Sequence, residues 1–264
     1  CRDDLRWVSA ERIRDELLKL LEGPYAGEAL QLLQRLGLLA FVLPELLPAA
    51  DLLQAKPGGS LLHHLIATAA ACPPDPVLRL AALLHDAGKP ATRRVEPDGR
   101  VTFHGHEVEG ERLARQACAR LRLDRETTER VATLVRMHMA AGPELGRKTL
   151  RRWLGRFGRR WVHDWFALRQ ADHVASGHGP DNPWLEGLRR QLAEVLAEEQ
   201  AFTLRDLAVD GHDVMRVLGI GPGPEVGRVL RGLLERVLED PGLNRREILL
   251  PLIESLGRQD GEPR

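Results

Sequence analysis

One short apolar run restricts the fold of this chain more than any other feature. The run Leu78-Arg-Leu-Ala-Ala-Leu-Leu84 is followed at once by His85-Asp86 and then by Ala87-Gly88-Lys89. It is apolar enough to be buried on most sides, yet it ends in an imidazole and a carboxylate. Such groups are costly to bury unless they are paired, hydrogen-bonded or bound to a metal. The sequence therefore predicts a buried helix whose end meets polar ligands from other segments.

Apolar residues recur at helical spacing along nearly the whole chain, and the alternation typical of strands is almost absent. This pattern predicts an all-α protein built as a helical bundle. The expected helices span residues 9–21, 26–36, 60–72, 76–86, 106–121, 124–139, 147–157, 160–175 and 184–200. Between residues 89 and 105, several Pro and Gly residues predict a loop or a small hairpin.

Two stretches rich in Gly and Pro divide the chain, Lys56-Pro-Gly-Gly59 and Ser176-Gly-His-Gly-Pro-Asp-Asn-Pro183. Such stretches interrupt helices and are typical of loops between compact parts. We therefore expect a helical segment over 1–56, a metal-binding domain over 57–178, and a helical linker with a C-terminal tail domain over 179–264.

The composition indicates a globular chain. Of its 264 residues, 43% are hydrophobic and 29% are charged, and the formal net charge is zero, so no global excess of positive charge indicates nucleic-acid binding. Cys1, Cys72 and Cys118 are far apart and odd in number, which argues against a disulfide framework or a zinc knuckle. No apolar run approaches the roughly 18 residues that span a membrane, and we expect no signal peptide. We expect a cytoplasmic protein without a membrane partner, and the first residue, which is not Met, favours a piece of a longer chain.

Six side chains of the kinds that bind metals lie on separate predicted helices, mostly close to a helix end. They are His64, His85, Asp86, His106, His138 and Asp172. A bundle can bring such positions to one site, because its metal sites are built from inward-facing side chains of facing helices. Mixed imidazole and carboxylate ligands favour Mn, Fe, Co or Ni, with Mg as a further option. The expected cofactor is one or two divalent ions, and the expected chemistry is metal-assisted hydrolysis of a phosphate ester.

A histidine taken alone is more often a surface residue or a satisfied core residue than a ligand. We assign six histidines to this class: His63, His104, His163, His173, His178 and His212. The same explanation outweighs metal binding for His106 or His138 taken singly. At the end of an apolar helix, His85-Asp86 favours metal binding.

The set of His64, His85-Asp86 and Asp172 resembles the signature of the HD superfamily of metal-dependent phosphohydrolases. His64 is preferred to its neighbour His63 because it lies where that family usually has histidine. The resemblance implies that one cation is held by His64, His85, Asp86 and Asp172.

Two further histidines are placed like the additional ligands of two-metal members of this superfamily. They are His106 in Phe103-His-Gly-His-Glu-Val-Glu-Gly110 and His138 in Val135-Arg-Met-His-Met139. The resemblance implies a second cation held by both histidines, with Asp86 as the bridge between the two ions.

The resemblance also suggests catalytic roles. A divalent cation makes water a stronger nucleophile near neutral pH and stabilises the phosphate oxygens. Asp86 would orient that water, and His106 or His138, where it is not a ligand, could protonate the leaving oxygen. Lys89 can reach the phosphate as a point charge, and its alternative role is that of a cation at a helix C-terminus.

The flanking segments resemble a second family. Val8-Ser-Ala-Glu-Arg-Ile-Arg-Asp-Glu-Leu17, Leu36-Gly-Leu-Leu39 and Leu43-Pro-Glu-Leu46 are similar to the helical RNA-binding segment of bacterial tRNA nucleotidyltransferases, the CCA-adding enzymes and related poly(A) polymerases. Phe202-Thr-Leu-Arg-Asp-Leu-Ala-Val-Asp-Gly211 and the turn at 219–224 are similar to their tail. The resemblance implies RNA, and tRNA in particular, as a partner. The paired Asp residues of that family's nucleotidyl-transfer head are not found in residues 1–264, so nucleotide addition would require a separate head.

The densest basic stretch coincides with the helix predicted over 147–157. Its basic residues are Arg147, Lys148, Arg151 and Arg152, and apolar residues lie between them at helical spacing. The basic face would point outward, and contacts from it to phosphates would give salt-dependent affinity for RNA of any sequence. The alternative is a solvated face paired with nearby acids, and the resemblance to RNA-binding enzymes favours RNA.

Together these patterns predict a metal-dependent phosphohydrolase or phosphodiesterase. The resemblances imply a substrate such as a nucleotide, or a 2′,3′-cyclic phosphate or 2′-phosphate at an RNA end, with a link to tRNA 3′-end processing. The alternative is the RNA-binding body and tail of a tRNA CCA-adding nucleotidyltransferase or poly(A) polymerase whose catalytic head is absent from this chain. A third hypothesis, an HD fold kept only as a structural module, is disfavoured because all six ligand types are present.

Overall fold

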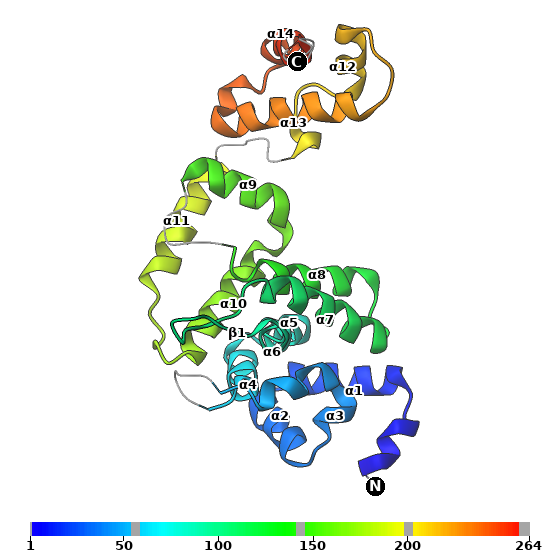
Figure 1. Cartoon of the computed structure of the whole chain (residues 1–264), viewed down its shortest axis with the longest axis vertical. Helices are drawn as coiled ribbons and strands as arrows, with labels where there is room; N and C mark the ends of the chain where they lie inside the picture. The colour runs from blue at the N-terminus through cyan, green and yellow to red at the C-terminus, as the bar shows by residue number, and fades with distance from the viewer. Residues whose placement is uncertain (1, 54–58, 141–145, 198–202, 259–264) are drawn as a thin grey trace. The chain divides into compact units, whose positions relative to one another are not determined.

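The computed structural model describes residues 2–53, 59–140, 146–197 and 203–258 (Figure 1). These residues form fourteen α-helices, several 3-10 helices and one two-stranded sheet, so the predicted all-α class is confirmed. The chain divides into two compact units: unit 1 comprises 1–141 and 160–185, and unit 2 comprises 142–159 and 186–264. The three-domain division expected from the sequence stays a prediction.

Unit 1 contains most of the helices. In chain order its elements are η1 (Arg2–Trp7), α1 (Ala10–Glu22), α2 (Ala26–Arg35), α3 (Leu39–Val42), η2 (Pro44–Ala50), α4 (Leu61–Ala71), α5 (Pro76–Leu84), α6 (Lys89–Thr92), β1 (Arg94–Val95), β2 (Val101–Thr102), α7 (His106–Arg120), α8 (Arg125–Met137) and α10 (Val162–Ala175). The short helix η3 (Arg159–Trp161) spans the boundary with unit 2.

The remaining elements are α9 (Arg147–Phe157), α11 (Pro183–Ala197), η4 (Leu204–Asp206), α12 (Gly211–Leu218), α13 (Pro224–Glu239), η5 (Pro241–Leu243) and α14 (Arg246–Arg258). Every helix predicted from apolar spacing is present, with ends displaced by a few residues. The last part of the predicted 184–200 helix and most of the 56–59 loop lie outside the described residues. None of the described helices is both long and apolar enough to cross a membrane.

Helix α5 lies at the centre of unit 1. It packs against α1, α4, α7, α8 and α10, and all its residues from Leu78 to Leu84 are buried. Asp75 begins the helix, because its carboxylate accepts hydrogen bonds from two backbone N–H groups of the first turn, and Pro76 suits the first helical position. Burial on all sides explains why this helix is apolar around its whole circumference. Its C-terminal end carries His85 and Asp86 into the middle of the bundle.

The single charged residue within α5 ties the N-terminal helices to this centre. Arg79 is buried, and its guanidinium donates hydrogen bonds to the carbonyl oxygens of Leu21, Gly23 and Cys72 at 2.7–3.2 Å. These carbonyls lie at helix ends, where backbone oxygens lack partners within the helix. Arg79 therefore supplies hydrogen-bond donors to the free carbonyl groups at the C-terminal ends of both α1 and α4.

The predicted loop between 89 and 105 is a short helix followed by a hairpin. β1 pairs antiparallel with β2, with Arg94 opposite Thr102 and Val95 opposite Val101. The strand β2 leads directly into α7 through Gly105, whose φ of 81° is readily adopted only by glycine. The hairpin therefore places residues 101–105 beside the first turn of α7.

In unit 2, helices α12, α13 and α14 pack around a small apolar core, and α9 packs against α13. Val214, Val229, Leu233, Val237 and Ile253 are buried in this core.

Candidate metal centre

All six predicted ligands come together in unit 1. His64 lies on α4, His85 and His138 immediately follow α5 and α8, His106 is the first residue of α7, and Asp172 lies near the end of α10. His64 is buried, whereas His63 is exposed to solvent. Ser60 caps the start of α4, because its hydroxyl accepts a hydrogen bond from the backbone N–H of His63. With this start, His64 lies on the inward face of α4.

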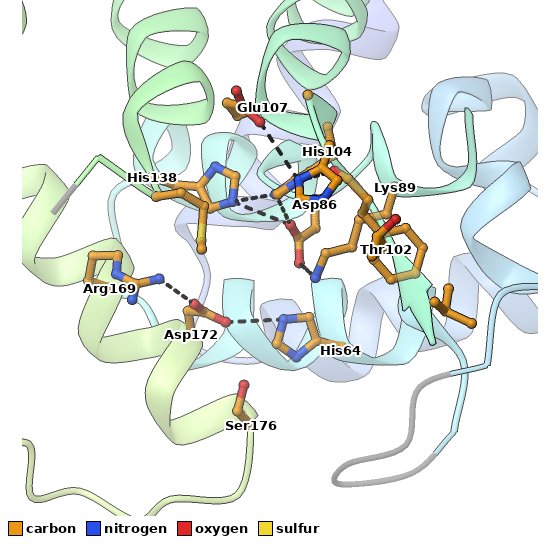
Figure 2. A pocket seen from close by; sticks show the side chains of 15 residues that line it. His64, Asp86, Lys89, Thr102, His104, Glu107, His138, Arg169, Asp172 and Ser176 are labelled. Atoms are coloured by element: carbon orange, nitrogen blue, oxygen red, sulfur yellow. Dashed lines mark hydrogen bonds and ion pairs between the residues drawn. The ribbon is translucent and has the colours of Figure 1, made fainter. Parts of the chain in front are cut away.

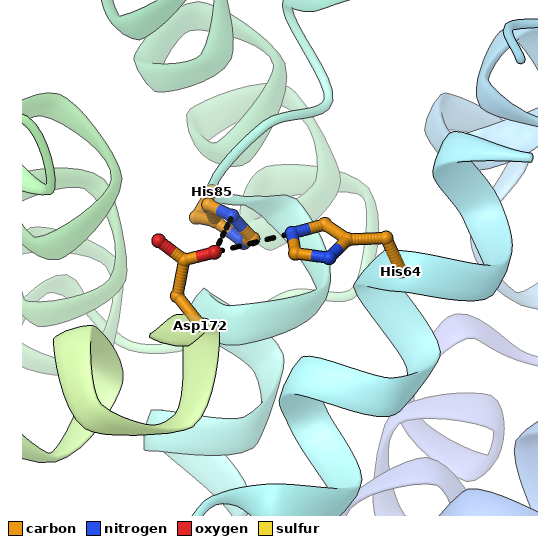
Figure 3. A group of neighbouring side chains, drawn as sticks. All are labelled: His64, His85 and Asp172. Atoms are coloured by element: carbon orange, nitrogen blue, oxygen red, sulfur yellow. Dashed lines mark ion pairs between the residues drawn. The ribbon is translucent and has the colours of Figure 1, made fainter. Parts of the chain in front are cut away.

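The first group of ligands is His64, His85 and Asp172 (Figure 3). Oδ1 of Asp172 lies 3.2 Å from Nε2 of His64 and 3.8 Å from Nε2 of His85. Both histidines are buried, and the three side chains come from three different helical segments.

The second group is Asp86, His106 and His138. Oδ1 of Asp86 lies 3.2 Å from Nε2 of His106 and 3.3 Å from Nε2 of His138, and these two nitrogens are 3.2 Å apart. The other oxygen of Asp86, Oδ2, lies 3.4 Å from Nε2 of His85. Asp86 therefore turns one oxygen toward each group, as a carboxylate that bridges two cations would.

Three of the histidines are oriented by their own backbone. Nδ1 of His85, His106 and His138 lies 2.7–2.8 Å from the carbonyl oxygen three residues earlier in each case. A carbonyl can only accept, so each Nδ1 carries the proton and donates it. In a neutral ring the other nitrogen, Nε2, then has a free electron pair. Each of these Nε2 atoms points into the ligand cluster.

This arrangement brings several acceptors together without enough donors. In the second group two imidazole Nε2 atoms and one carboxylate oxygen lie within 3.3 Å of one another. His64 Nδ1, His85 Nε2 and Asp86 Oδ1 are buried and have no hydrogen-bond partner among the residues that the structure describes. Unpaired buried acceptors are costly, and a cation removes the cost. The donor set of nitrogen and oxygen atoms therefore fits a divalent metal in either group.

The electrostatics favour the ligand forms of Asp86, Asp172 and His138, whereas the pKa of His85 is raised, because the opposing effect of burial is outweighed by Asp86 and Asp172. Burial opposes ionisation of Asp86, but the adjacent His85, His106 and His138 hold its pKa well below the usual range. Burial likewise opposes ionisation of Asp172, and the neighbouring histidines lower its pKa. Burial lowers the pKa of His138, which keeps this imidazole neutral at neutral pH. Both carboxylates are thus ionised, as metal binding requires.

Two glycines let the Asp86 segment lie directly against α7. A side chain at Gly88 would place its Cβ 2.2 Å from the carbonyl oxygen of His106 and 2.7 Å from the backbone nitrogen of Gly110. A Cβ at Gly110 would lie 3.0 Å from Val135 of α8. This close approach sets the distance between Asp86 and His106. The sequence analysis assigned no role to either glycine.

The two groups open onto one pocket of about 720 Å³ (Figure 2). Its walls include His64, Asp86, Lys89, Thr102, Phe103, His104, His106, Glu107, His138, Met139, Arg169, Asp172 and Ser176. The volume is within the range of small-molecule sites. His104, which we had assigned to the surface or core, is an exposed part of this wall.

Lysine and arginine side chains contact the two carboxylates of the centre. Nζ of Lys89, at the first residue of α6, lies 2.5 Å from Oδ2 of Asp86. Nη1 of Arg169 donates to Oδ2 of Asp172 at 2.9 Å. Arg169 was not predicted, although its position three residues before Asp172 on one helix face is a signal that sequence reasoning could have used.

The predicted RNA-binding residues Arg147, Lys148, Arg151 and Arg152 are on α9, which belongs to unit 2. Lys148 and Arg152 form ion pairs with Glu239 and Glu235 of α13. Arg151 is buried, and its Nη1 donates to the carbonyl oxygen of Leu238 at 2.9 Å. Acids therefore face part of the basic stretch, as the alternative interpretation expected.

Two protein-family models match the chain. The HD domain family matches residues 64–174, which contain all six ligands. The structure of this part of the chain agrees with an HD-domain helical fold. The family described as the probable RNA and SrmB-binding site of polymerase A matches residues 1–49. Both predicted resemblances are thus confirmed.

Two curated relatives of the chain are named as tRNA nucleotidyltransferases. The "CC-adding tRNA nucleotidyltransferase" of Thermus thermophilus is 41% identical over 87% of this chain and 53% of its own length. The "A-adding tRNA nucleotidyltransferase" of Deinococcus radiodurans is 39% identical over 88% of this chain and 55% of its own length. The chain is homologous to these enzymes and spans about half the length of each.

The fold agrees with these matches. The crystal structure of the Bacillus stearothermophilus CCA-adding enzyme in complex with CTP superimposes with a TM-score of 0.63, over 97% of this chain and 54% of that one. At 23% sequence identity this similarity concerns the fold alone.

Proposed function

We propose that the HD domain of this chain is a metal-dependent phosphohydrolase. The observation that carries the proposal is the pair of ligand groups joined by Asp86, with one carboxylate oxygen turned toward each group. Both groups border a single pocket that also contains the ammonium of Lys89. We propose a phosphate ester as the substrate, either a nucleotide or an RNA end carrying a 2′,3′-cyclic phosphate or a 2′-phosphate.

The six ligands would hold two cations. His64, His85 and Asp172 would hold one cation, and His106 and His138 a second, with Asp86 shared between them. Such cations lower the pKa of water and stabilise the phosphate oxygens in the transition state.

The chain's own residues supply the remaining steps. Lys89 would bind a phosphate oxygen, since its flexible ammonium lies in the pocket next to Asp86. Asp86 would accept a hydrogen bond from the attacking water and so orient it. If only the first group binds a cation, His106 or His138 would be available to protonate the leaving oxygen.

The test is release of phosphate, or opening of 2′,3′-cyclic nucleotides, by the purified chain with Mn, Co, Ni or Mg. We expect activity that Asp86→Ala abolishes, while the exposed carboxylate change Asp181→Ala leaves it unaltered. No hydrolysis with any of these metals, although metal binds in a calorimetric titration, would refute the proposed function.

The comparisons favour a second, compatible function, which is binding of tRNA. The first 49 residues match an RNA-binding family, and the relatives with the highest identities among those reported are named for additions to tRNA. We propose that the chain forms the RNA-binding body and tail of a tRNA nucleotidyltransferase whose catalytic head is a separate segment or chain. The measurement is binding of tRNA as a function of salt, where electrostatic contacts give a linear fall of log affinity with log salt concentration.

The basic face of α9, formed by Arg147, Lys148 and Arg152, is our proposed RNA contact. Replacing its acidic partners by Glu235→Gln and Glu239→Gln frees two cations, so we expect tRNA to bind roughly threefold or more tightly. The control is Glu194→Gln, at an exposed position of α11. If the two glutamate changes leave the affinity for tRNA unchanged, as this control should, α9 is excluded as the RNA contact.

A further inference from the structure

One face of α10 borders the pocket through three residues. Arg169, Asp172 and Ser176 follow one another at helical spacing, so they project from the same side of the helix. All three line the pocket, and Figure 2 shows them together along its wall. Asp172 is accounted for as a ligand, whereas Arg169 and Ser176 have no role in the function proposed above.

Arg169 is held in a fixed position from two directions. Its Nη1 donates to Oδ2 of Asp172 at 2.9 Å, and its guanidinium carbon lies 5.9 Å from the centre of the Trp184 ring. The side chain is 21% exposed. A guanidinium restrained by a carboxylate and an aromatic face has lost most of its rotamer freedom before any ligand arrives, which favours binding.

The guanidinium retains donors that Asp172 does not use. An arginine has five N–H donors in a planar fork, and its Nε here is buried without a hydrogen-bond partner among the described residues. The planar fork suits the tetrahedral oxygens of phosphate, which it can contact through two parallel hydrogen bonds. Ser176 adds a hydroxyl donor one helical turn beyond Asp172.

Lys89 is a second cation beside a ligand carboxylate. Its ammonium contacts Oδ2 of Asp86, the oxygen turned toward His85, and Arg169 contacts Oδ2 of Asp172. The two cations enter the pocket from opposite sides in Figure 2. Each ligand carboxylate is therefore balanced by one cation, so an anion entering between them meets no net repulsion from the carboxylates.

We propose that Arg169 and Ser176 form a phosphate-binding site on the α10 wall, which takes the dianion of a terminal phosphate opposite Lys89. The proposal names the substrate class of the hydrolase proposed above, a phosphomonoester, and it rests on that function for its role in catalysis. Binding of the anion itself requires only the residues of this chain.

The experiment measures phosphate binding without metal. The chain in excess EDTA is titrated with inorganic phosphate and, separately, with a nucleoside 2′-monophosphate, and binding is followed by ³¹P NMR line broadening. We expect Arg169→Gln to weaken both ligands about tenfold or more, because hydrogen bonds to a charged group are lost. Arg125→Gln, which removes an exposed arginine at the start of α8, should change neither affinity.

Two further measurements decide between substrate binding and mere support of Asp172. Arg169→Lys keeps the charge but loses the fork, so we expect an intermediate affinity for phosphate. If Arg169→Gln weakens only Mn binding and leaves phosphate binding in EDTA unchanged, Arg169 positions the ligand and the proposal is overturned. Should Arg169→Gln not fold, unchanged phosphate binding by Arg169→Lys and Ser176→Ala would overturn it equally.

The outcome is separable from that of the proposed function. If the chain binds phosphate through Arg169 but hydrolyses no ester with any metal, the anion site is confirmed and the proposed hydrolase function is wrong. If the wild type and Arg169→Gln hydrolyse phosphomonoesters with the same KM, the hydrolase function is confirmed and the anion site is wrong.

Discussion

Replacing Gly88 by alanine tests whether backbone contact sets the geometry of the metal centre. Gly88 has φ −77° and ψ −15°, which any residue adopts, so the substitution introduces no backbone strain. Its Cβ, however, would lie 2.2 Å from the carbonyl oxygen of His106, where real contacts stay at 3.0 Å or more. The Asp86 segment and α7 must therefore separate by roughly 0.8 Å, since backbone atoms in a packed interior cannot deform locally.

The expected effects follow from that displacement. Overpacking of this kind costs about 1–3 kcal/mol, which lowers Tm by about 3–10 °C for a domain of this size. Asp86 Oδ1 and His106 Nε2, now 3.2 Å apart, would move by more than the 0.2 Å or so that metal coordination tolerates. We expect the affinity for Mn to fall about 10- to 100-fold, the range found when groups that support metal ligands are changed.

The assay is calorimetric titration with Mn, together with thermal unfolding in EDTA. Gly187→Ala is the matched control, because the Cβ that it adds would meet no described atom within 4 Å apart from its chain neighbours and the backbone of its own helix. In the interior of α11 it should stabilise the chain by up to about 1 kcal/mol and leave Mn binding intact. Wild-type affinity for Mn in Gly88→Ala would refute the reasoning that this contact places Asp86 against His106.

Three further predictions concern ligand choice, stability and pH. His64→Asn should weaken Mn binding about tenfold or more in a calorimetric titration, whereas His63→Asn should not; equal losses would contradict the assignment of His64 as the ligand. Arg79→Met should cost about 3–5 kcal/mol in urea unfolding, because two buried carbonyl groups and one part-buried carbonyl group lose their donor. A cost below about 1 kcal/mol would show that water replaces the guanidinium. Burial opposes ionisation of Asp75, but Arg130 and two backbone N–H groups lower its pKa below the unfolded value. The ionised carboxylate therefore stabilises the chain fully above that unfolded value, and this stabilisation is lost as the pH falls through the folded pKa. In urea unfolding, Asp75→Ala should cost about 1 kcal/mol at pH 7 and less below about pH 4. A cost that does not depend on pH would contradict the prediction.

Local signals in the sequence were sufficient for the helices and for the kinds of ligand. Ser60 and Asp75 begin α4 and α5 because their side chains accept backbone N–H groups nearby in the chain, a relation visible in sequence. The apolar run before His85 indicated burial on all sides, and α5 is indeed surrounded by five helices. Convergence of the ligands followed from the need to satisfy buried polar groups.

The features that were not predicted depend on contacts between distant segments. The close approach at Gly88 involves the backbone of α7, and a glycine in a loop does not indicate which chain lies against it. Glu239 lies 91 residues after the Lys148 with which it pairs, so the composition of α9 alone could not show that acids face it. Arg169 could have been placed beside Asp172 by helical spacing, but its contact with Trp184 required the turn between α10 and α11.

The backbone hydrogen bonds of the histidines have a consequence for how metal binding would be measured. At the ends of α5 and α8, one ring nitrogen of His85 and of His138 completes the hydrogen bonding of the last helical turn, and the other belongs to the ligand cluster. The rings are thus ordered by helix formation and need no cation to adopt their orientation. Metal should therefore bind with little loss of conformational entropy and little change in the circular dichroism of the chain, unlike small zinc domains that fold only around their ion.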